Sequence, residues 1–482
     1  MPPVDPARAA PASFRDPAGF IYHCEGTLYR RVTAHGLPAY HRLMESGLYD
    51  ELVGEGLLIS HVEATHPPRS SGSVTLRPEL VPFVSYPYEW CFGQLKDAAL
   101  ATLEICRRAI GHDMWLKDAS AYNIQFVGSS PVLIDTLSLA DYPEGAPWPA
   151  YQQFCQHFLV PLALMAYVDI GLSQLLRVHL DGVPLDLANR LLPLKTRLHP
   201  ALLAHVHLHA AAQRQFADGP PRTKDHSELQ VSRVGLLGLL DSLRGAIQAL
   251  HYEPKGTVWS DYYGHTNYSN DAMEAKHRTI DTWIGALPVR PERAWDVGAN
   301  NGEFSRILSA RGIFTVAWDI DPAAVEQNWR RCRQESELNL LPLVQDLTNP
   351  SPDMGWAGRE RDGLLARGPA DLVLALALIH HLAITNNVPL GGIAALFAEL
   401  CSQHLIVEWV EASDSQARRL LARHTGEVVG YDRANFRDAF SRYFTIEAEQ
   451  EVEGAQRTLY LLRRRTNDDG QSSVVFSATE DG

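Results

Sequence analysis

The sequence has little of what would place the chain in a membrane, in an oxidising compartment or around a zinc ion. No apolar run reaches the ~18 residues that a membrane-spanning helix needs, and Asp169 and Gln174 interrupt the longest one, Phe158–Leu175. Cysteine is scarce, with no Cys-x-x-Cys pair and no zinc-site spacing. We therefore expect reduced thiols in a cytoplasmic protein that holds no metal. The six cysteines are Cys24, Cys91, Cys106, Cys155, Cys332 and Cys401.

Positive charge is also in short supply. Lys and Arg number 43 against 57 Asp and Glu, which gives a formal net charge of −14. Proteins that bind nucleic acids usually carry a basic surface, because neutralising phosphates supplies much of their affinity. The sequence therefore predicts no nucleic-acid partner and no membrane partner, and it carries no signal for an oligomeric state.

The chain is long enough for two or three domains. It has 482 residues, of which 45% are hydrophobic and 21% are charged, as in an ordinary globular protein. Loops and shifts in composition predict the boundaries. We expect a flexible N-terminus over 1–16, an α+β domain over 17–218, a helical linker region over 219–288, an α/β domain over 289–465 and a disordered tail over 466–482.

Apolar spacing predicts several elements before residue 293. Pro161 is expected to break or kink one of the helices. A segment dense in Tyr, Asp, Asn and His, Trp259–Asn270, separates the last two helices. Helices are predicted over 40–53, 94–109, 151–180, 234–250 and 272–287, and short strands over 124–126 and 131–135.

A strand-turn-helix unit opens the C-terminal part. Residues 294–304 read Ala-Trp-Asp-Val-Gly-Ala-Asn-Asn-Gly-Glu-Phe. Glycines let the backbone of such a turn approach a ligand closely, and the free N–H groups of the following helix attract negative charge. From Arg293 onward strands and helices alternate, which is the pattern of a parallel sheet with crossover helices.

Acidic residues close the next two predicted strands. Asp319 lies 23 positions after Asp296, the distance of one strand-helix-strand step, and a carboxylate there can accept both hydroxyls of a ribose. Asp346 ends the strand predicted over 343–347, where it can accept from an adenine amino group. Further strands are predicted over 371–378, 404–410, 444–452 and 457–462.

These pieces resemble class I S-adenosylmethionine (SAM)-dependent methyltransferases, whose D-x-G-x-G-x-G turn packs against the methionine part of SAM. The resemblance implies a Rossmann-like α/β domain of seven strands, the last two antiparallel, with SAM as its cofactor. Asn300 replaces the middle glycine, and asparagine tolerates the left-handed region better than most residues. A plain nucleotide-binding Rossmann domain is the alternative. The cofactor-binding residues implied are Asp296, Gly298, Asn300, Gly302, Asp319, Ile320, Asp346, Leu347 and Ala377.

Two histidines follow the fourth strand of this series. Class I methyltransferases place the substrate and the transferred methyl group there, and histidine is the commonest general base. We expect His380 or His381 to deprotonate or orient the methyl acceptor. The alternative is that both histidines only cap the strand or pack on its loop. Glu408, near the end of the fifth strand, is the next candidate for a catalytic residue.

A second pattern lies in the N-terminal half. Asn123 comes five positions after Asp118, and Asp135 comes twelve positions after Asn123, at the end of an apolar strand. This spacing resembles kinase-like phosphotransferases, in which the first Asp takes the acceptor proton and the other two residues hold magnesium. The resemblance implies a kinase-like fold in which Arg31 stands in for the nucleotide-binding lysine. The sequence shows no glycine-rich loop, so we expect an inactive or substrate-presenting domain. The alternative is that Asp118 and Asn123 only cap a loop.

A further resemblance extends over nearly the full length of the chain. It is carried by residues 86–90, 116–126, 151–158, 375–382 and 386–390. In these segments the chain is similar to the bacterial family of nodulation-protein-like SAM-dependent methyltransferases. The resemblance implies transfer of a methyl group to an O or N atom of a small molecule or glycan. Two alternatives stay open: an enzyme that both phosphorylates and methylates, and a non-catalytic protein that binds SAM.

Overall fold

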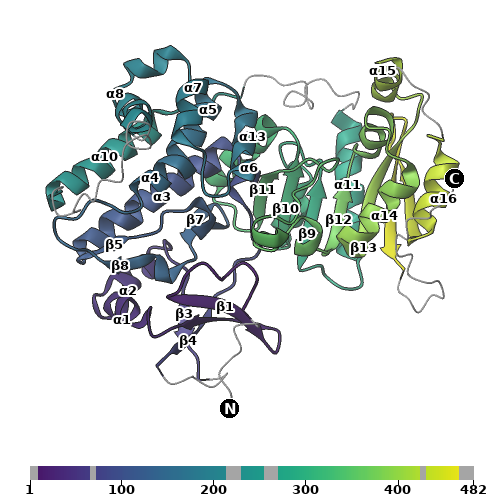
Figure 1. The fold of residues 1–482 in the computed structure, drawn as a ribbon. Helices are drawn as coiled ribbons and strands as arrows, with labels where there is room; N and C mark the ends of the chain where they lie inside the picture. The colour runs from purple at the N-terminus through teal and green to yellow at the C-terminus, as the bar shows by residue number, and fades with distance from the viewer. Residues whose placement is uncertain (1–8, 66–71, 213–229, 255–269, 424–429, 466–482) are drawn as a thin grey trace, which may run out of the picture. The chain divides into compact units, whose positions relative to one another are not determined.

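The chain divides into two compact units. The computed structural model describes residues 9–65, 72–212, 230–254, 270–423 and 430–465 (Figure 1). The predicted tail 466–482, the first eight residues of the predicted flexible N-terminus and nearly all of the segment 259–270 lie outside these ranges. The first unit comprises Met1–Ser260, Ile320–Gln345 and Ser351–Gly363, and the second comprises Asp261–Asp319, Asp346–Pro350 and Leu364–Gly482.

The first unit begins with a four-stranded antiparallel sheet of order β1-β2-β4-β3. A tight turn joins β1 to β2, with positive φ at Glu25 and Gly26. The predicted helix over 40–53 is wrong as a single element. Gly47, at φ +81°, separates it into two helices. The elements are β1 (Gly19–Cys24), β2 (Thr27–Val32), α1 (Leu37–Glu45), α2 (Leu48–Gly54), β3 (His61–Glu63) and β4 (Val74–Pro78).

A long helix, α3 (Phe92–Gly111), forms the centre of the first unit and confirms the helix predicted over 94–109. Its apolar residues recur on one face, and twelve of its side chains are buried. The two short strands predicted over 124–126 and 131–135 are also confirmed, as an antiparallel hairpin. The hairpin is β6 (Ile124–Val127) with β7 (Ser130–Leu133), and the other two-stranded ladder is β5 (Met114–Leu116) with β8 (Leu139–Asp141).

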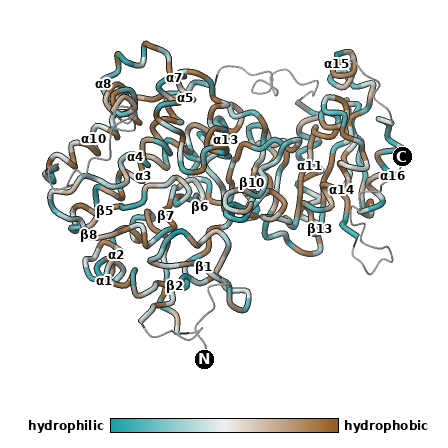
Figure 2. The backbone as a smooth tube through the Cα atoms, viewed as in Figure 1, coloured by the Kyte–Doolittle hydropathy of each residue, from teal (hydrophilic) through white to brown (hydrophobic). Residues whose placement is uncertain are grey.

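The helix predicted over 151–180 is a series of shorter helices. Pro161 does not interrupt the helical backbone, which continues from residue 151 through a π turn into α5 (Val160–Tyr167). The π turn directly precedes the proline, and such turns are where helices accommodate an irregularity. The hydrophobic residues of α5 appear as a brown stretch in Figure 2. The other helices and helical turns of this part of the chain are α4 (Tyr151–Phe154), η5 (Cys155–Leu159), η6 (Ile170–Gln174), α6 (Leu175–Val178), α7 (Leu185–Leu191), η7 (Leu194–Leu198), α8 (Pro200–Leu202) and η8 (Leu203–Leu208), followed by the long helix α10 (Arg233–Ala249).

A helix from much later in the chain, α13 (Pro322–Glu335), packs on α3 within the first unit. The N–H of Gly93 donates to Glu326 at 2.7 Å, and the indole N–H of Trp329 donates to Asp97 at 3.0 Å. A Cβ at position 93 would lie 2.7 Å from the Trp329 ring, so only glycine allows this approach. The ring of Trp329 also meets Phe126 edge-on, with centroids 5.1 Å apart.

A seven-stranded sheet of order β11-β10-β9-β12-β13-β15-β14 confirms the strand series predicted from residue 293 onward. Strands β9, β10, β12 and β13 run parallel to one another. β15 pairs antiparallel with both β13 and β14, so the last two strands are antiparallel to each other, as predicted. The interior strand β12 is buried on both faces, as expected for a parallel strand. The strands are β9 (Arg293–Val297), β10 (Phe314–Asp319), β11 (Leu340–Val344), β12 (Ala370–Ala375), β13 (Cys401–Val410), β14 (Phe444–Glu451) and β15 (Arg457–Arg464).

Two predicted strands are too long at their carboxyl ends. The third ends at Val344, so Asp346 lies in the following turn. The fourth ends at Ala375, because Ala377 takes a positive φ of 50° that a strand does not allow. The helices of the second unit are α11 (Asn270–Ala286), α12 (Ser305–Ala310), α14 (Leu390–Leu400), α15 (Ser415–Arg423) and α16 (Arg433–Ser441), with a π turn η13 (His381–Thr385).

The predicted linker region 219–288 contributes to both units rather than forming one of its own. α10 belongs to the first unit and α11 to the second. No helix among the described residues is long and apolar enough to cross a membrane.

Replacing Trp329 by alanine should destabilise the first unit. The ring is 1% exposed, and its removal leaves a cavity between α13 and α3. The expected loss is about 3–5 kcal/mol of unfolding free energy, measured by urea denaturation followed by far-ultraviolet circular dichroism. Val234→Ala on α10, at an 80% exposed position, is the control and should change the free energy by less than about 0.5 kcal/mol. If the two variants unfolded at the same midpoint concentration of urea, α13 would not be part of the core of the first unit.

Candidate functional site

The turn after β9 is held in a conformation that brings bare backbone to the end of the sheet. Gly298, Asn300 and Gly302 all have positive φ, of 78°, 52° and 78°. The N–H groups of Gly298 and Ala299 donate to the carbonyl of Trp318 at 2.8 and 2.9 Å. A Cβ on Gly298 would lie 3.3 Å from the side chain of Leu378, so the turn leaves little room for a larger residue. Asn300 thus adopts the left-handed conformation that the sequence predicts.

The predicted ribose-binding acid lies beside this turn. Asp319 is the last residue of β10 and is 8% exposed. Its Oδ2 accepts the N–H of Asn300 at 2.7 Å, which joins the turn to the end of the neighbouring strand. The next residue, Ile320, is 57% exposed, as is suitable for an apolar contact with a planar ring.

Asp346 is placed differently from the expectation. It closes a local turn, because its Oδ1 accepts from the N–H and hydroxyl of Thr348 at 2.8 and 2.7 Å. Leu347, beside it, is half-buried, as is Ala377, which follows β12. These three residues lie in turns that follow strands of the sheet, and their assignment to a cofactor stays a prediction.

Asp296, in β9, is a buried acid whose charge is unfavourable. It is 2% exposed, and the hydroxyl of Ser305 donates to its Oδ2 at 2.6 Å. Burial raises the pKa of Asp296 to about 7, although the Ser305 hydrogen bond and the charge of Lys276 act in the opposite direction. Asp296 therefore keeps its proton to a higher pH than an exposed aspartate does.

A chain of buried charges runs beneath the end of β13. Lys276 on α11 donates to Oε2 of Glu408 at 2.7 Å, and Arg457 on β15 lies 3.6 Å from the other oxygen of Glu408. Arg457 also lies 3.3 Å from Asp414. Burial lowers the pKa of Lys276, while the charge of Glu408 acts to raise it. Glu408 itself is 0% exposed, so it is engaged on both sides by cations.

The two predicted histidines lie in contact with each other. Their ring centroids are 4.1 Å apart. His380 is 0% exposed, and neither of its ring nitrogens has a hydrogen-bond partner among the described residues, whereas His381 is only partly buried. Burial lowers the pKa of His380 well below its usual value and that of His381 to about 4, and Arg457 lowers both further. Both imidazoles are therefore neutral at pH 7.

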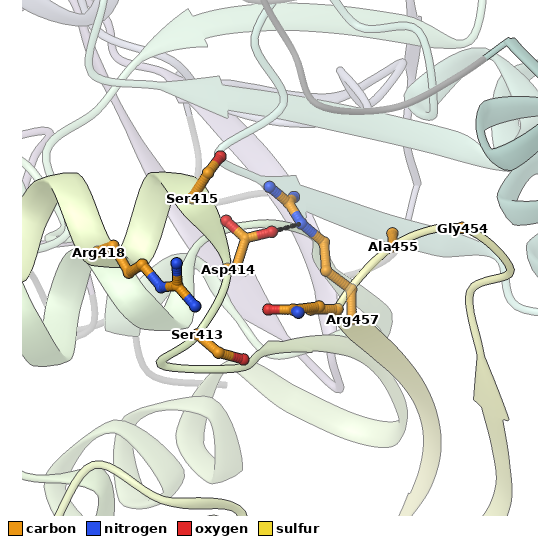
Figure 3. A pocket seen from close by; sticks show the side chains of 8 residues that line it. Ser413, Asp414, Ser415, Arg418, Gly454, Ala455 and Arg457 are labelled. Carbon is orange, nitrogen blue, oxygen red and sulfur yellow. Dashed lines mark hydrogen bonds and ion pairs between the residues drawn. The ribbon is translucent and has the colours of Figure 1, made fainter.

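A polar cavity of about 350 Å³ opens after the carboxyl end of β13 (Figure 3). It is lined by residues 413–415 and Arg418 from the start of α15, and by residues 454–457 before and at the start of β15. The guanidinium of Arg457 points toward Asp414 in its wall (Figure 3). Sequence reasoning missed Lys276 and Arg457, because both meet Glu408 only through the fold.

The first unit holds a separate cavity of about 630 Å³ that brings together the three residues of the kinase-like pattern. Asp118, Asn123 and Asp135 all line it. Asp118 accepts from the amide of Gln153 at 2.7 Å, and Asp135 forms an ion pair with Arg30. Burial acts to raise the pKa of Asp135, but the charge of Arg30 together with the hydrogen bonds from Ser138, Arg30 and Leu137 outweighs it, so the pKa is lowered. Within the described ranges, no group of three or more His, Cys, Asp and Glu residues is arranged to hold a metal ion.

Arg31, the expected stand-in for the kinase lysine, does not line this cavity. Arg31 is 3% exposed and donates to Tyr22 and Ser73, away from Asp135. Arg30 is the cation that lines the cavity. Successive side chains of a strand point to opposite faces, so a shift of one position reverses the assignment.

Comparisons with known proteins give one full-length relative. The chain is 33% identical over 469 residues to nodulation protein NoeA of Rhizobium meliloti strain 1021, covering 95% of this chain and 96% of that protein. No protein-family model matches the chain.

Several of the solved structures that are similar to part of the chain are methyltransferases by name. One is the magnesium protoporphyrin IX methyltransferase of Synechocystis PCC 6803 with bound SAH, at 17% identity and a TM-score of 0.30, covering 43% of this chain and 93% of that one. Another is the N-methyltransferase NodS of Bradyrhizobium japonicum WM9 with S-adenosyl-L-homocysteine, at 11% identity and a TM-score of 0.31, covering 44% and 100%. The bifunctional kinase-methyltransferase WbdD matches at 15% identity and a TM-score of 0.30, covering 42% and 41%.

The raised pKa of Asp296 predicts a pH-dependent cost of folding. Its ordinary pKa is 3.8 and its folded value about 7, so between these values the native state binds more protons than the unfolded state. Stability then falls as pH rises through this window. Asp296→Asn lacks the titration, so its melting temperature relative to wild type should increase from pH 4 to pH 7. Asp438→Asn, at an exposed position on α16, is the control. A difference that does not change with pH would contradict the raised pKa.

Proposed function

The chain belongs to the family of nodulation protein NoeA, and from this membership and the site we propose that it is a SAM-dependent methyltransferase. The acceptor is an O or N atom of a small molecule or glycan. The observation that carries the proposal is the hydrogen bond between the left-handed turn residue Asn300 and Asp319 at the end of β10. This hydrogen bond joins a turn that begins and ends with glycine to an acid at the carboxyl ends of parallel strands, where such sheets bind their ligands.

The residues of this turn suit the two ends of SAM. The backbone of Gly298 and Gly302 allows close approach of the methionine part, and Asp319 offers a carboxylate to the ribose hydroxyls. Ile320 supplies an exposed apolar surface for the adenine ring, and Asp346 and Leu347 are proposed to meet its edge. Together these residues offer the backbone, carboxylate and apolar groups that a nucleoside with a short charged tail requires. When bound, SAM supplies an electrophilic methyl group on a sulfonium.

The histidine pair is proposed to orient the methyl acceptor. His381 is the partly exposed member and would contact the acceptor O–H or N–H, whereas the buried His380 would hold its ring in place. Neutral imidazoles add no positive charge beside a cationic sulfonium, so they do not oppose cofactor binding. An imidazole with a pKa near 4 accepts a hydrogen bond but is a weak base, which favours orientation of the acceptor over full removal of its proton.

Glu408 is a poor candidate for the base, although it was expected as one. Its two oxygens face Lys276 and Arg457, and a carboxylate paired with two cations gives up affinity for a proton. We propose that Glu408 is a positioning residue, which holds α11 and β15 against β13 through its ion pairs with Lys276 and Arg457.

Asp319→Ala should weaken SAM binding in titration calorimetry. Loss of hydrogen bonds to a charged group costs about 1.5–3 kcal/mol, or roughly tenfold to 150-fold in Kd. Asp438→Ala, which removes an exposed acid elsewhere in the second unit, should bind SAM like wild type. If Asp319→Ala also binds SAM like wild type, the ribose assignment is wrong.

His381→Ala should lower kcat with a methyl acceptor by on the order of 100-fold, the low end of the range for a lost acid-base group. The SAM Kd should stay unchanged, because the histidines follow β12 rather than the glycine turn. His380→Ala should show a smaller loss in kcat. Near wild-type turnover by both variants would make the pair structural.

The kinase-like alternative is supported by one observation, the shared cavity of Asp118, Asn123 and Asp135. The ion pair between Arg30 and Asp135 argues against activity, because it engages the carboxylate that would hold magnesium. We therefore expect the full chain to show no magnesium-dependent ATP turnover. Turnover that Asp135→Ala abolishes would establish the bifunctional alternative. A chain that binds SAM but transfers no methyl group to any acceptor would establish the non-catalytic one.

A further inference from the structure

The α15 cavity (residues 413–415, 418 and 454–457) borders the turn that carries the histidine pair. It lies after the carboxyl end of β13 and before β15, both in the second unit. The helix that forms one of its walls, α15, packs through Ala417 on Ile384 of η13, the π turn that begins at His381. Arg457, from the opposite wall, acts on the charge state of both histidines. A molecule held in this cavity therefore lies beside the proposed acceptor site.

The buried charges in and behind the wall of the α15 cavity balance one another. Asp414 accepts the N–H of Gln416 at 2.8 Å and lies 3.3 Å from Arg457. Arg457 and Lys276 in turn face the two oxygens of Glu408. Two cations thus meet two anions, so this set adds no net charge that a ligand would have to match.

One further cation in the wall is not part of this set. Arg418, in the first turn of α15, is exposed, and the described residues offer its guanidinium neither a hydrogen bond nor an ion pair. Its side chain extends from the helix toward the loop of Ser413 and Asp414 (Figure 3). α15 carries three arginines and no acidic residue, in a chain whose net charge is −14.

The uncharged polar groups around Arg418 can all donate hydrogen bonds. They are the hydroxyls of Ser413 and Ser415 and the amide of Gln456. A guanidinium forms paired hydrogen bonds with phosphate, sulfate or carboxylate oxygens, and neighbouring hydroxyl and amide donors can complete such a site. The volume of about 350 Å³ lies in the range of about 300–1,000 Å³ that small-molecule pockets occupy.

We propose that the α15 cavity binds an oxyanion group of the methyl acceptor, which is a phosphate, a sulfate or a carboxylate. The assignment of this group to the acceptor rests on the proposed methyltransferase function, whereas the binding of an oxyanion does not. Arg418 is then the residue that selects an anionic acceptor over a neutral one.

The first test is titration calorimetry of the full chain with inorganic phosphate, sulfate and acetate, in chloride buffers of constant ionic strength. We expect binding of an oxyanion, and the tightest of the three identifies the group. Arg418→Gln should weaken it by about tenfold or more, the scale for a hydrogen bond to a charged group. Arg419→Gln is the matched control, because it removes an exposed arginine of the same helix that does not line the cavity.

Two results of this titration would overturn the oxyanion site. One is that none of the three anions binds to the wild-type chain. The other is an equal loss in Arg418→Gln and Arg419→Gln, which would indicate general attraction of adventitious ions to α15. Ser413→Ala, at an exposed position, should weaken binding by a smaller factor than Arg418→Gln because the charge remains.

The second test asks whether the oxyanion belongs to the acceptor. Small molecules and glycans of the cells that produce the protein are separated by anion exchange and incubated with the chain and methyl-labelled SAM. We expect label in the retained, anionic fraction, and Arg418→Gln should raise KM for this fraction by about tenfold. Its kcat and its Kd for SAM should stay near wild type, because Asp319 and the glycine turn are unchanged.

The outcomes of the second test separate the two proposals. Label confined to the unretained, neutral fraction would overturn the anionic acceptor and leave the methyltransferase proposal standing. Absence of label from every fraction would contradict the methyltransferase proposal and with it the assignment to an acceptor. In that case the calorimetric titration still decides whether the α15 cavity is an oxyanion site.

Discussion

The second unit depends on a set of charges that have no access to water. Lys276, Glu408 and Arg457 come from α11, β13 and β15, and all are 3% exposed or less. Each charge is tolerable only because the others are present, since removing one partner of a buried pair typically costs about 3–5 kcal/mol. The three elements are therefore bound to one another by electrostatics as well as by the sheet and its apolar core. The same two ion pairs are the reason why we propose that Glu408 positions these elements and does not act as a base.

The same charges determine how the neighbouring histidines behave. Lys276 and Arg457 carry positive charge close to His380, and this adds to the effect of burial in disfavouring a protonated imidazole. The end of β12 thus presents neutral hydrogen-bonding groups, although the nearest ionised groups are cations. A comparable balance is found in the first unit, where Arg30 and Asp135 neutralise each other beside neutral histidines. In both units, therefore, paired charges lie near imidazoles that stay neutral at pH 7.

Much of the second unit could be predicted from the sequence because its features are local. The left-handed Asn300 and the strand-end Asp319 belong to one strand-helix-strand step, so spacing alone indicates that they meet. The predicted carboxyl ends of β11 and β12 both lie three residues too late. After β12 the apolar residues continue although Ala377 takes a positive φ, and after β11 the chain turns at Asp346. Lys276 could not be predicted as the partner of Glu408, which lies 132 positions away. Which of the adjacent residues Arg30 and Arg31 lines the cavity of the first unit could not be predicted, because their side chains point to opposite faces of β2 and the sequence does not show which face is which.

The first unit is not a continuous stretch of sequence. Its long helix α3 is covered by α13, which the chain reaches only after it has completed β9 and β10 of the other unit. Gly93 is shaped to receive a side chain more than two hundred positions further along. Without residues 320–345, Gly93, Asp97 and Phe126 would lack their partners Glu326 and Trp329 on α13. A protein cut before residue 320 would therefore hold most of the residues of the first unit but not the helix that packs on α3.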